Sequence, residues 1–320
     1  MNEFDLIKRY LAPLSAAEPG AFGLTDDAAI LSVPLGYELV VTKDAIVQGV
    51  HFIGNEPPYQ IAQKLLRTNL SDLASMGAKP QSYFLALMLP ETIDEAWIAE
   101  FTAGLAADQK EFGIILAGGD TVRSPTLSLS LTALGTVLAG QALRRSGAHV
   151  GDDIYVTGTI GDASLGLQVA LAELPIDEYL LERYRLPQPR LEIGTKLHGI
   201  ATACMDVSDG LLQDLGHIAQ SSGNGAEINW DAIPLSAAAK QILSRIALPY
   251  ETVLAGGDDY ELLFTAPVTQ REAIDTLALT AGVPVTRIGV VKEGKEVKVV
   301  DKSGKEIYVS KRGYNHFKVG

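Results

Sequence analysis

The sequence lacks the features that cross-link secreted proteins or anchor proteins in membranes. Its 320 residues contain a single cysteine, Cys204, so no disulfide can form within the chain, which is typical of proteins from a reducing cytoplasm. No apolar run approaches the roughly 18 residues that a membrane-spanning helix requires. The first residues, MNEFDLIKRYL, include acidic side chains and do not resemble a secretory signal. We therefore expect a cytoplasmic protein that does not bind membranes.

Positive charge is also scarce. The chain has 26 Lys and Arg residues against 39 Asp and Glu residues, which gives a formal net charge of −13. A surface this acidic repels the phosphates of nucleic acids, so we expect no nucleic-acid partner. Acidic residues also favour solubility, but many of these aspartates stand in glycine-rich turns rather than along helix faces. Their positions indicate a further role.

Common catalytic motifs are missing as well. The chain contains no G-x-x-x-x-G-K-[ST] phosphate loop, no H-E-x-x-H, no G-x-S-x-G and no C-x-x-C. The segment TGTIGDASLG at 157–166 follows an apolar run, but it lacks the lysine of a phosphate loop and the glycine spacing of a dinucleotide-binding fold. We interpret this segment as a turn that enters a helix.

Alternating strand and helix patterns predict an α/β (α+β) fold with two domains. Apolar residues make up 47% of the chain and charged residues 20%, which supports substantial cores in a chain of this length. In the first half, periodicity predicts helices at 3–11, 58–77 and 94–112, and strands at 26–33, 37–44, 82–89, 113–117 and 126–138.

The second half continues the alternation. Its predicted strands are 153–158, a run ending at Val207-Ser208-Asp209, 226–230 and 259–265, and its predicted helices are 162–174, 177–185, 189–202, 210–221 and 270–281. The charged, glycine-rich segment RRSGAHVGDD at 144–153 interrupts the pattern. We therefore predict an N-terminal domain over 1–146 and a C-terminal α/β domain over 147–320.

The pentapeptide LAGGD occurs twice, at 116–120 and at 254–258. A Ser-Asp pair precedes each copy at nearly the same distance, in NLSDL (69–73) and in DVSDG (206–210). A glycine turn after a buried strand explains either copy taken alone. The matched spacing and the carboxylates around both copies favour two ligand-binding segments, and they hint at two related halves.

Aspartates at predicted turns and strand ends are the most informative residues. They are Asp26, Asp27, Asp44, Asp72, Asp120, Asp206 and Asp209. One such residue is usually a turn or helix cap. Several together suit Mg²⁺, which binds one or two carboxylates along with waters and substrate phosphates. Because such ions neutralise phosphate charge, a protein without a phosphate loop can handle ATP in this way.

Eight segments, taken in order, resemble the thiamine-monophosphate kinase family. They are DDAAI (26–30), VTKDAIVQGVHF (41–52), NLSDLASMGA (69–78), AGGDT (117–121), RRSGAHVGD (144–152), DVSDGLLQDLGHIA (206–219), GGDDYELLF (256–264) and GYNHF (313–317). The family belongs to the superfamily of aminoimidazole-ribonucleotide and selenophosphate synthetases. The resemblance implies that a homodimer, with ATP as co-substrate and several Mg²⁺ ions, converts thiamine monophosphate to thiamine diphosphate in thiamine biosynthesis. It also implies that the N-terminal domain forms the central β-structure of the dimer.

The resemblance also assigns roles to individual residues. It implies Mg²⁺ ligands at Asp27, Thr42, Lys43, Asp44, Asp72, Asp120, Asp206 and Asp209, ATP contacts at Gly119, Asp120, Arg145 and Ser208, and substrate contacts at His51, Asp258 and Tyr314. Asp72, Asp120 and Arg145 would carry the catalytic role. Lys43 stands where the family commonly has a small hydroxyl residue that binds Mg²⁺. At this position Lys43 could bind Mg²⁺ only through its backbone. Asp258 stands where Glu is common, and it keeps the charge with a shorter reach.

The implied reaction needs no general base, because a phosphate monoester with a second pKa near 6 is already mostly a dianion at neutral pH. The difficulty is to bring two polyanions into line, so we expect direct transfer without a phosphoenzyme. We therefore interpret Cys204 as a buried core residue rather than a nucleophile. We interpret His149, His198 and His217 as ordinary turn or helix residues.

Three alternatives stay open. An ATP-dependent ring closure of purine synthesis would share the acidic site, although GVHF and GGDDYELLF favour the thiamine enzyme. A selenophosphate synthetase would show a reactive cysteine near its N-terminus, and a hydrogenase-maturation relative would end in cysteine, whereas this chain ends in HFKVG. A non-catalytic nucleotide- or metal-binding module, or an acidic interaction protein, is the third. Retention of every acidic position named above argues against lost activity.

Overall fold

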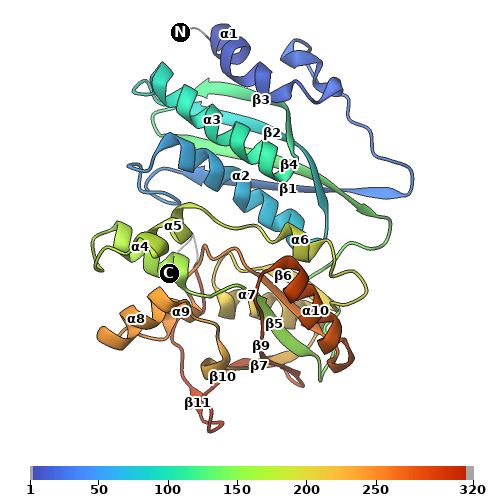
Figure 1. Ribbon diagram of the computed structural model, residues 1–320, viewed down its shortest axis with the longest axis vertical. Helices are drawn as coiled ribbons and strands as arrows, with labels where there is room; N and C mark the ends of the chain where they lie inside the picture. The colour runs from blue at the N-terminus through green and yellow to red at the C-terminus, as the bar shows by residue number, and fades with distance from the viewer. Residues whose placement is uncertain (1–2, 315–320) are drawn as a thin grey trace. The chain divides into compact units, whose positions relative to one another are not determined.

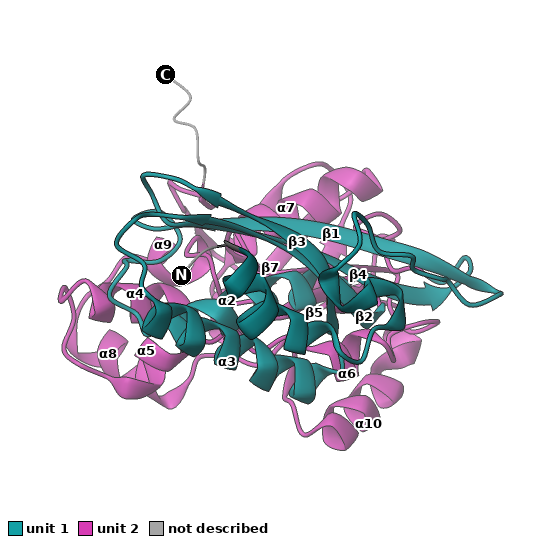
Figure 2. Ribbon diagram, turned by 90° about the horizontal axis from the view of Figure 1, so that it is seen from above, with its two compact units in different colours: residues 1–73, 78–141 teal, residues 74–77, 142–320 magenta. Residues whose placement is uncertain are grey.

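The computed structural model describes residues 3–314, and the chain divides into two compact units (Figures 1 and 2). Unit 1 holds residues 1–73 and 78–141, and unit 2 holds residues 74–77 and 142–320. Each unit combines a β-sheet with helices, so the predicted two-domain α/β class is confirmed.

Unit 1 is built on a sheet of four strands in the order β1-β4-β2-β3 among its described residues. The strands are β1 (Tyr37–Val47), β2 (Lys79–Leu89), β3 (Ile115–Arg123) and β4 (Ser128–Leu138). β4 runs antiparallel to both β1 and β2, while β3 runs parallel to β2. The first LAGGD therefore lies inside β3, whereas the sequence predicted a strand that stops at residue 117.

Helices α2 (Pro58–Ser75) and α3 (Glu95–Phe112) cover one face of this sheet (Figure 1). α3 begins at the predicted cap, because the Asp94 carboxylate accepts a hydrogen bond of 2.8 Å from the Trp97 N–H. It ends at Gly113, whose left-handed φ of 67° few other residues adopt. The two helices approach closely, since a Cβ atom at Gly104 would lie 2.3 Å from the Tyr59 carbonyl oxygen.

The N-terminal segment forms four short helical pieces before β1. They are α1 (Glu3–Leu6), η1 (Ile7–Leu11), η2 (Ala12–Ser15) and η3 (Pro19–Leu24). The prediction of a strand at 26–33 is wrong. This segment bonds back to a 3₁₀-helix rather than to a strand, through the Ile30 N–H and the Gly20 carbonyl at 2.9 Å, and strand propensity alone supplies no ladder partner.

Unit 2 contains a mixed sheet in the order β11-β10-β7-β9-β5-β8-β6. Its strands are β5 (Asp153–Thr157), β6 (Ala203–Asp206), β7 (Gly225–Asn229), β8 (Leu262–Ala266), β9 (Val285–Lys292), β10 (Val297–Val300) and β11 (Glu306–Ile307). β8 lies between β5 and β6 and is buried along its whole length. The residues that precede β8 are therefore anchored next to the core of the unit.

The helices of unit 2 are shorter than α2 and α3. They are α4 (Asp162–Ala170), α5 (Glu178–Arg185), α6 (Leu191–Gly194), α7 (Leu211–Ser222), α8 (Ala237–Arg245), α9 (Glu251–Leu254) and α10 (Arg271–Ala281). The predicted helix at 189–202 is reduced to α6, while α8 was missed although Ser236 caps it at the Ala239 N–H, 3.0 Å away. No helix between residues 3 and 314 combines the length and apolar character needed to cross a membrane.

Candidate active site

The first group of predicted site residues lies on the helix-covered side of the unit 1 sheet. Thr42 and Asp44 share this face because side chains alternate along a strand. The Thr42 hydroxyl donates a hydrogen bond to the carboxylate of Asp72, which α2 carries. The backbone N–H of Asp44 donates to the Asn69 side-chain oxygen over 3.2 Å, and Asn69 is fully buried. The sheet and α2 thus bring the Thr42 hydroxyl to the Asp72 carboxylate, and Asp44 shares the same side of the sheet.

Lys43 points to the opposite face of the sheet. The strand register aligns Lys43 with Thr132, Phe84 and Gly118 across the four strands, and the next row of this face contains Asp120. These residues line a cavity of about 620 Å³ within unit 1. The side chain of Lys43 is thus separated from those of Thr42 and Asp44, which leaves its backbone as the part that can share their ligand.

This cavity has an acidic part and an apolar part. The acidic part contains Asp26, Asp27 and Asp120, and the apolar part is lined by Ile7, Leu11, Ala21, Leu24, Phe84 and Leu116. Asp27, Gly119 and Asp120 are exposed to solvent. Gly119 is required by the close approach of two strands, since a Cβ atom there would lie 2.0 Å from the Leu85 carbonyl oxygen. The first LAGGD thereby presents Asp120 at the wall of a pocket.

His51 occupies a tight turn directly after β1. The Val47 N–H donates to His51 Nδ1 over 3.2 Å, and the Val47 carbonyl accepts the His51 N–H at 3.0 Å. The ring is half-buried and is fixed by its own turn. Its predicted contact with the substrate stays a prediction.

The second group of predicted residues gathers in unit 2, after β6. Asp206 ends this strand and is 2% exposed, and Ser208 and Asp209 follow in the loop that leads to α7. The backbone N–H groups of Ser208 and Asp209 both donate to the carboxylate of Asp214, over 3.0 and 3.1 Å. The loop is held in one shape by a buried carboxylate from the first turn of α7.

Asp214 was missed by the sequence analysis, although an acid in the first turn of a helix after Ser-Asp-Gly is a recognisable signal. Burial and then the negative charge of Asp209 raise the pKa of Asp214 to about 7, while the backbone hydrogen bonds and the charge of Arg145 act in the opposite direction. Arg145 is exposed, and its positive charge stabilises the ionised form of Asp214, the residue that holds this loop.

The second LAGGD and Tyr314 lie against the same loop. The Asp258 N–H donates to the Ser208 carbonyl over 2.9 Å, and the Tyr314 N–H donates to the Asp209 carbonyl over 3.0 Å. A Cβ atom at Gly257 would lie 2.4 Å from the Ser208 carbonyl oxygen, so glycine permits this approach. Unit 2 thus brings together Ser208, Asp209, Asp258 and Tyr314. Of the GYNHF segment, only Gly313 and Tyr314 lie within the described residues.

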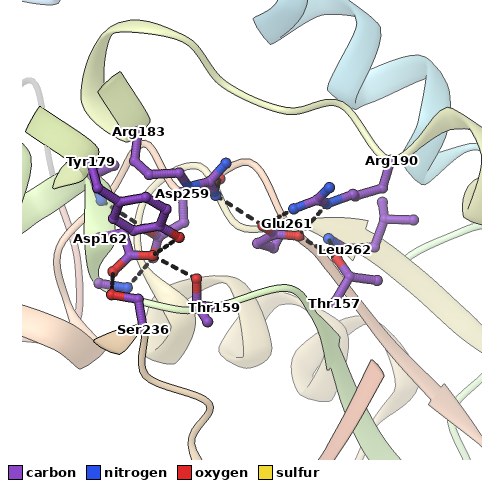
Figure 3. A network of polar contacts seen from close by, with 12 residues as sticks. Thr157, Thr159, Asp162, Tyr179, Arg183, Arg190, Ser236, Asp259, Glu261 and Leu262 are labelled. Carbon is purple, nitrogen blue, oxygen red and sulfur yellow. Dashed lines mark hydrogen bonds and ion pairs between the residues drawn. The ribbon is translucent and has the colours of Figure 1, made fainter. Parts of the chain in front are cut away.

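A buried polar network beside the second LAGGD was also missed (Figure 3). Glu261 is fully buried, and its carboxylate accepts hydrogen bonds from Arg183 at 2.9 Å and from Arg190 at 2.5 and 2.6 Å. The carboxylate of Asp259, 1% exposed, accepts from the N–H groups of Gly161 and Ala163 at 2.7 and 3.1 Å. An acidic pair just before a Leu-Leu-Phe strand was the available signal in the sequence.

The remaining cysteine and histidine interpretations agree with the structure. Cys204 lies in β6 with 1% exposure, and burial raises the pKa of its thiol, so it packs as predicted. His149 is exposed beside Asp152, and a ring nitrogen of His198 lies 3.1 Å from the Gly77 carbonyl oxygen. Over residues 3–314, no three His, Cys, Asp or Glu side chains are grouped so that they could hold a metal by themselves.

Two family models cover most of the chain. The first, AIR synthase related protein, N-terminal domain, matches residues 25–137, and the second, AIR synthase related protein, C-terminal domain, matches residues 149–302. The class of protein is therefore a two-domain AIR synthase-related protein, in agreement with the two units described above.

Full-length relatives define the family within this class. The thiamine-monophosphate kinase of Salmonella typhimurium is 42% identical over 99% of this chain and 98% of its own length. The crystal structure of thiamine-monophosphate kinase from Stenotrophomonas maltophilia K279a has a TM-score of 0.85 at 42% identity, over 96% of this chain and 98% of that chain. The structure of AaThiL complexed with AMPPCP and TMP has a TM-score of 0.80 at 30% identity, over 94% of this chain and 98% of that chain. The chain belongs to the thiamine-monophosphate kinase family.

Proposed function

We propose that this protein transfers the terminal phosphoryl group of ATP to thiamine monophosphate, giving thiamine diphosphate and ADP. The observation that carries the proposal is family membership over nearly the whole chain, together with a relative that binds AMPPCP and TMP. The acidic residues of both units supply the chemistry that such a reaction requires. An ATP-dependent ring closure would share these acids, and the substrate test below separates the two.

Within unit 1, the cavity at Gly119 and Asp120 suits a nucleotide. Its apolar part offers a surface for a base, while Asp27 and Asp120, in its acidic part, would hold the metal ions that bind the phosphates. The donor set fits Mg²⁺, because carboxylate, hydroxyl and backbone oxygens are the ligands this ion prefers. Asp72 with Thr42 and Asp44, and Asp206 with Asp209, would hold further ions. Bound Mg²⁺ would neutralise phosphate charge at the site.

The other residues position the substrates and carry charge. Arg145 and Ser208 would bind the nucleotide phosphates, while His51, Asp258 and Tyr314 would face thiamine monophosphate, whose ring is cationic. The acceptor oxygen is already ionised at neutral pH, so the chain needs to orient it in line rather than to remove a proton. Cys204 is buried with a raised thiol pKa and is unsuited to carry a phosphoryl group.

Purified protein with Mg²⁺ and ATP is expected to convert thiamine monophosphate to thiamine diphosphate, with one ADP formed for each product molecule, as chromatography of both would measure. Free thiamine should be a poorer acceptor by on the order of 100-fold in kcat/KM, because its hydroxyl, unlike the ionised phosphate, would have to lose a proton to a general base. Equal efficiency with thiamine would contradict the base-free mechanism. ADP formation only with a ring-closure substrate would contradict the proposed activity.

We also propose a homodimer that forms through the face of the unit 1 sheet opposite α2 and α3. The apolar residues exposed on this face are Tyr37, Leu39, Val41, Val122 and Leu138. Exposed apolar residues gathered on one face indicate an interaction surface. A second copy of the same face would cover them, as the family resemblance implies.

Val41→Glu is expected to convert the dimer to a monomer, because a charge buried without a partner costs several kcal/mol. Light scattering coupled to gel filtration would measure the mass. Val268→Glu is the matched control, since Val268 of unit 2 is 51% exposed against 56% for Val41. A dimer that survives Val41→Glu would remove this face from the interface.

A further inference from the structure

We propose that Asp259 and Glu261 are positioning residues that hold the Asp258 carboxylate in place at the substrate end of the site. This inference rests on the proposed function, in which Asp258 contacts thiamine monophosphate. It comes from the conformation of the segment 258–261 and from the polar network beneath it (Figure 3).

The segment has an unusual backbone. Asp258 has a φ of 71° and Tyr260 a φ of 50°, in the left-handed region that side-chain-bearing residues seldom adopt. Two such residues within three positions persist only where the surrounding structure fixes them. Backbone hydrogen bonds fix one side, from the Asp258 N–H to the Ser208 carbonyl at 2.9 Å and from the Tyr260 N–H to the Val207 carbonyl at 2.8 Å. The segment is therefore tied to the loop that carries Ser208 and Asp209.

The alternating buried side chains fix the other side. Asp259 accepts two backbone N–H groups at the start of α4, and the nearby Asp162 carboxylate accepts the hydroxyl of Ser236 over 2.6 Å. Burial raises the pKa of Asp259 to about 8. The carbonyl oxygen of Asp259 also accepts a hydrogen bond of 3.3 Å from Arg183. One residue of the strained segment is thus held by side chain and backbone together.

Glu261 is the second attachment. Arg183 reaches both residues, since its Nη2 atom donates to the Asp259 carbonyl and to the Glu261 carboxylate, and Arg190 adds two hydrogen bonds to that carboxylate. The Thr157 hydroxyl donates to Glu261 over 2.6 Å and accepts the Leu262 N–H at 2.8 Å. A Cβ atom at Gly158 would lie 2.1 Å from a Glu261 carboxylate oxygen, so the turn after β5 is shaped around this group.

Tyr260 lies between these two attachments, and Asp258 directly precedes the first of them. With Asp259 and Glu261 directed into the unit, Asp258 and Tyr260 are left half-buried at its surface, and the Tyr260 hydroxyl lies 3.3 Å from an Asp258 carboxylate oxygen. Loosening Glu261 would let Asp258 leave its left-handed conformation and move its carboxylate. We expect that change to weaken thiamine monophosphate binding selectively, because the loop that carries Ser208 is also held by the Asp214 carboxylate, which accepts the N–H groups of Ser208 and Asp209.

The test uses the full-length enzyme and a conservative pair of variants at Thr157. Thr157→Val removes the hydroxyl that Glu261 accepts, and Thr157→Ser retains it. We expect Thr157→Val to raise the KM for thiamine monophosphate by on the order of 10-fold, as for other residues that orient a ligand-contacting group, with the KM for ATP within about twofold and with recovery in Thr157→Ser. Glu261→Gln should shift the same KM further.

Thr265→Val is the matched control, because Thr265 on β8 is fully buried, like Thr157, and its hydroxyl lies 2.7 Å from that of Thr202, near the end of β8 that is distant from Glu261. The Thr265→Val variant should lose about as much thermal stability as Thr157→Val. Its KM values for thiamine monophosphate and ATP should not change. Equal changes in both KM values for Thr157→Val, or a profile identical to that of Thr265→Val, would overturn the inference.

Asp258→Asn separates this inference from the function on which it rests. It should raise the KM for thiamine monophosphate and leave that for ATP unchanged. A wild-type enzyme that does not phosphorylate thiamine monophosphate would overturn the proposed function, and this inference with it. A wild-type enzyme that does so, with unchanged KM values in both Asp258→Asn and Thr157→Val, would overturn the inference alone.

Discussion

Asp72→Asn is expected to lower kcat for thiamine monophosphate phosphorylation by on the order of 10²- to 10³-fold, the loss typical when one preorganised electrostatic group is removed from an active site. The substitution removes a ligand charge but keeps an oxygen that can accept the Thr42 hydroxyl, so the fold should persist. Steady-state rates over a range of Mg²⁺ concentrations would measure the effect. The Mg²⁺ concentration for half-maximal rate should rise.

Asp275→Asn is the control for the change in net charge, because Asp275 is exposed on α10 and outside the proposed site. It should leave both kcat and the Mg²⁺ dependence unchanged. If Asp72→Asn retained wild-type activity with the same Mg²⁺ dependence, Asp72 would not be a metal ligand.

Asp108→Ala is expected to reduce the free energy of unfolding of unit 1 by about 3–5 kcal/mol, because it removes the buried carboxylate that pairs with a buried cation and leaves that cation with the exposed Glu111 at 3.2 Å. Asp108 on α3 is fully buried, and its carboxylate accepts hydrogen bonds of 2.8 and 2.9 Å from Arg67 on α2 and of 2.7 Å from Gln63. Burial disfavours the charge of Arg67, but the hydrogen bond to Asp108 helps to raise its pKa overall. Urea unfolding, followed by circular dichroism, would measure the loss.

Asp94→Ala on the same helix is the matched control. It removes only a helix cap and should cost about 0.5–2 kcal/mol. The double variant Arg67→Met with Asp108→Leu should recover most of the stability, since apolar residues of similar volume often replace a buried ion pair without loss. An Asp108→Ala variant as stable as Asp94→Ala would show that the ion pair does not hold α2 against α3.

Local signals in the sequence were sufficient for α3, which is capped at both ends. α3 begins after Asp94 and ends at Gly113. Both signals are local, because a side-chain cap and a left-handed glycine act within one turn of the backbone. Helical periodicity likewise predicted α2. The segment 26–33 failed because strand propensity does not specify a partner strand, and its Ile30 bonds to η3 instead.

The candidate site follows the same division. The sequence by itself determined which residue types are present: the aspartates, the two LAGGD segments and the family motifs that contain them. Only the tertiary structure decided that Thr42 and Asp44 face α2 while Lys43 faces the cavity, because sheet pairing and helix packing, acting between residues far apart in the chain, assign each face. The structure alone also decided that Asp259 and Glu261 are buried. Their partners Gly161, Arg183 and Arg190 lie about 70 to 100 residues away, beyond the reach of any local pattern.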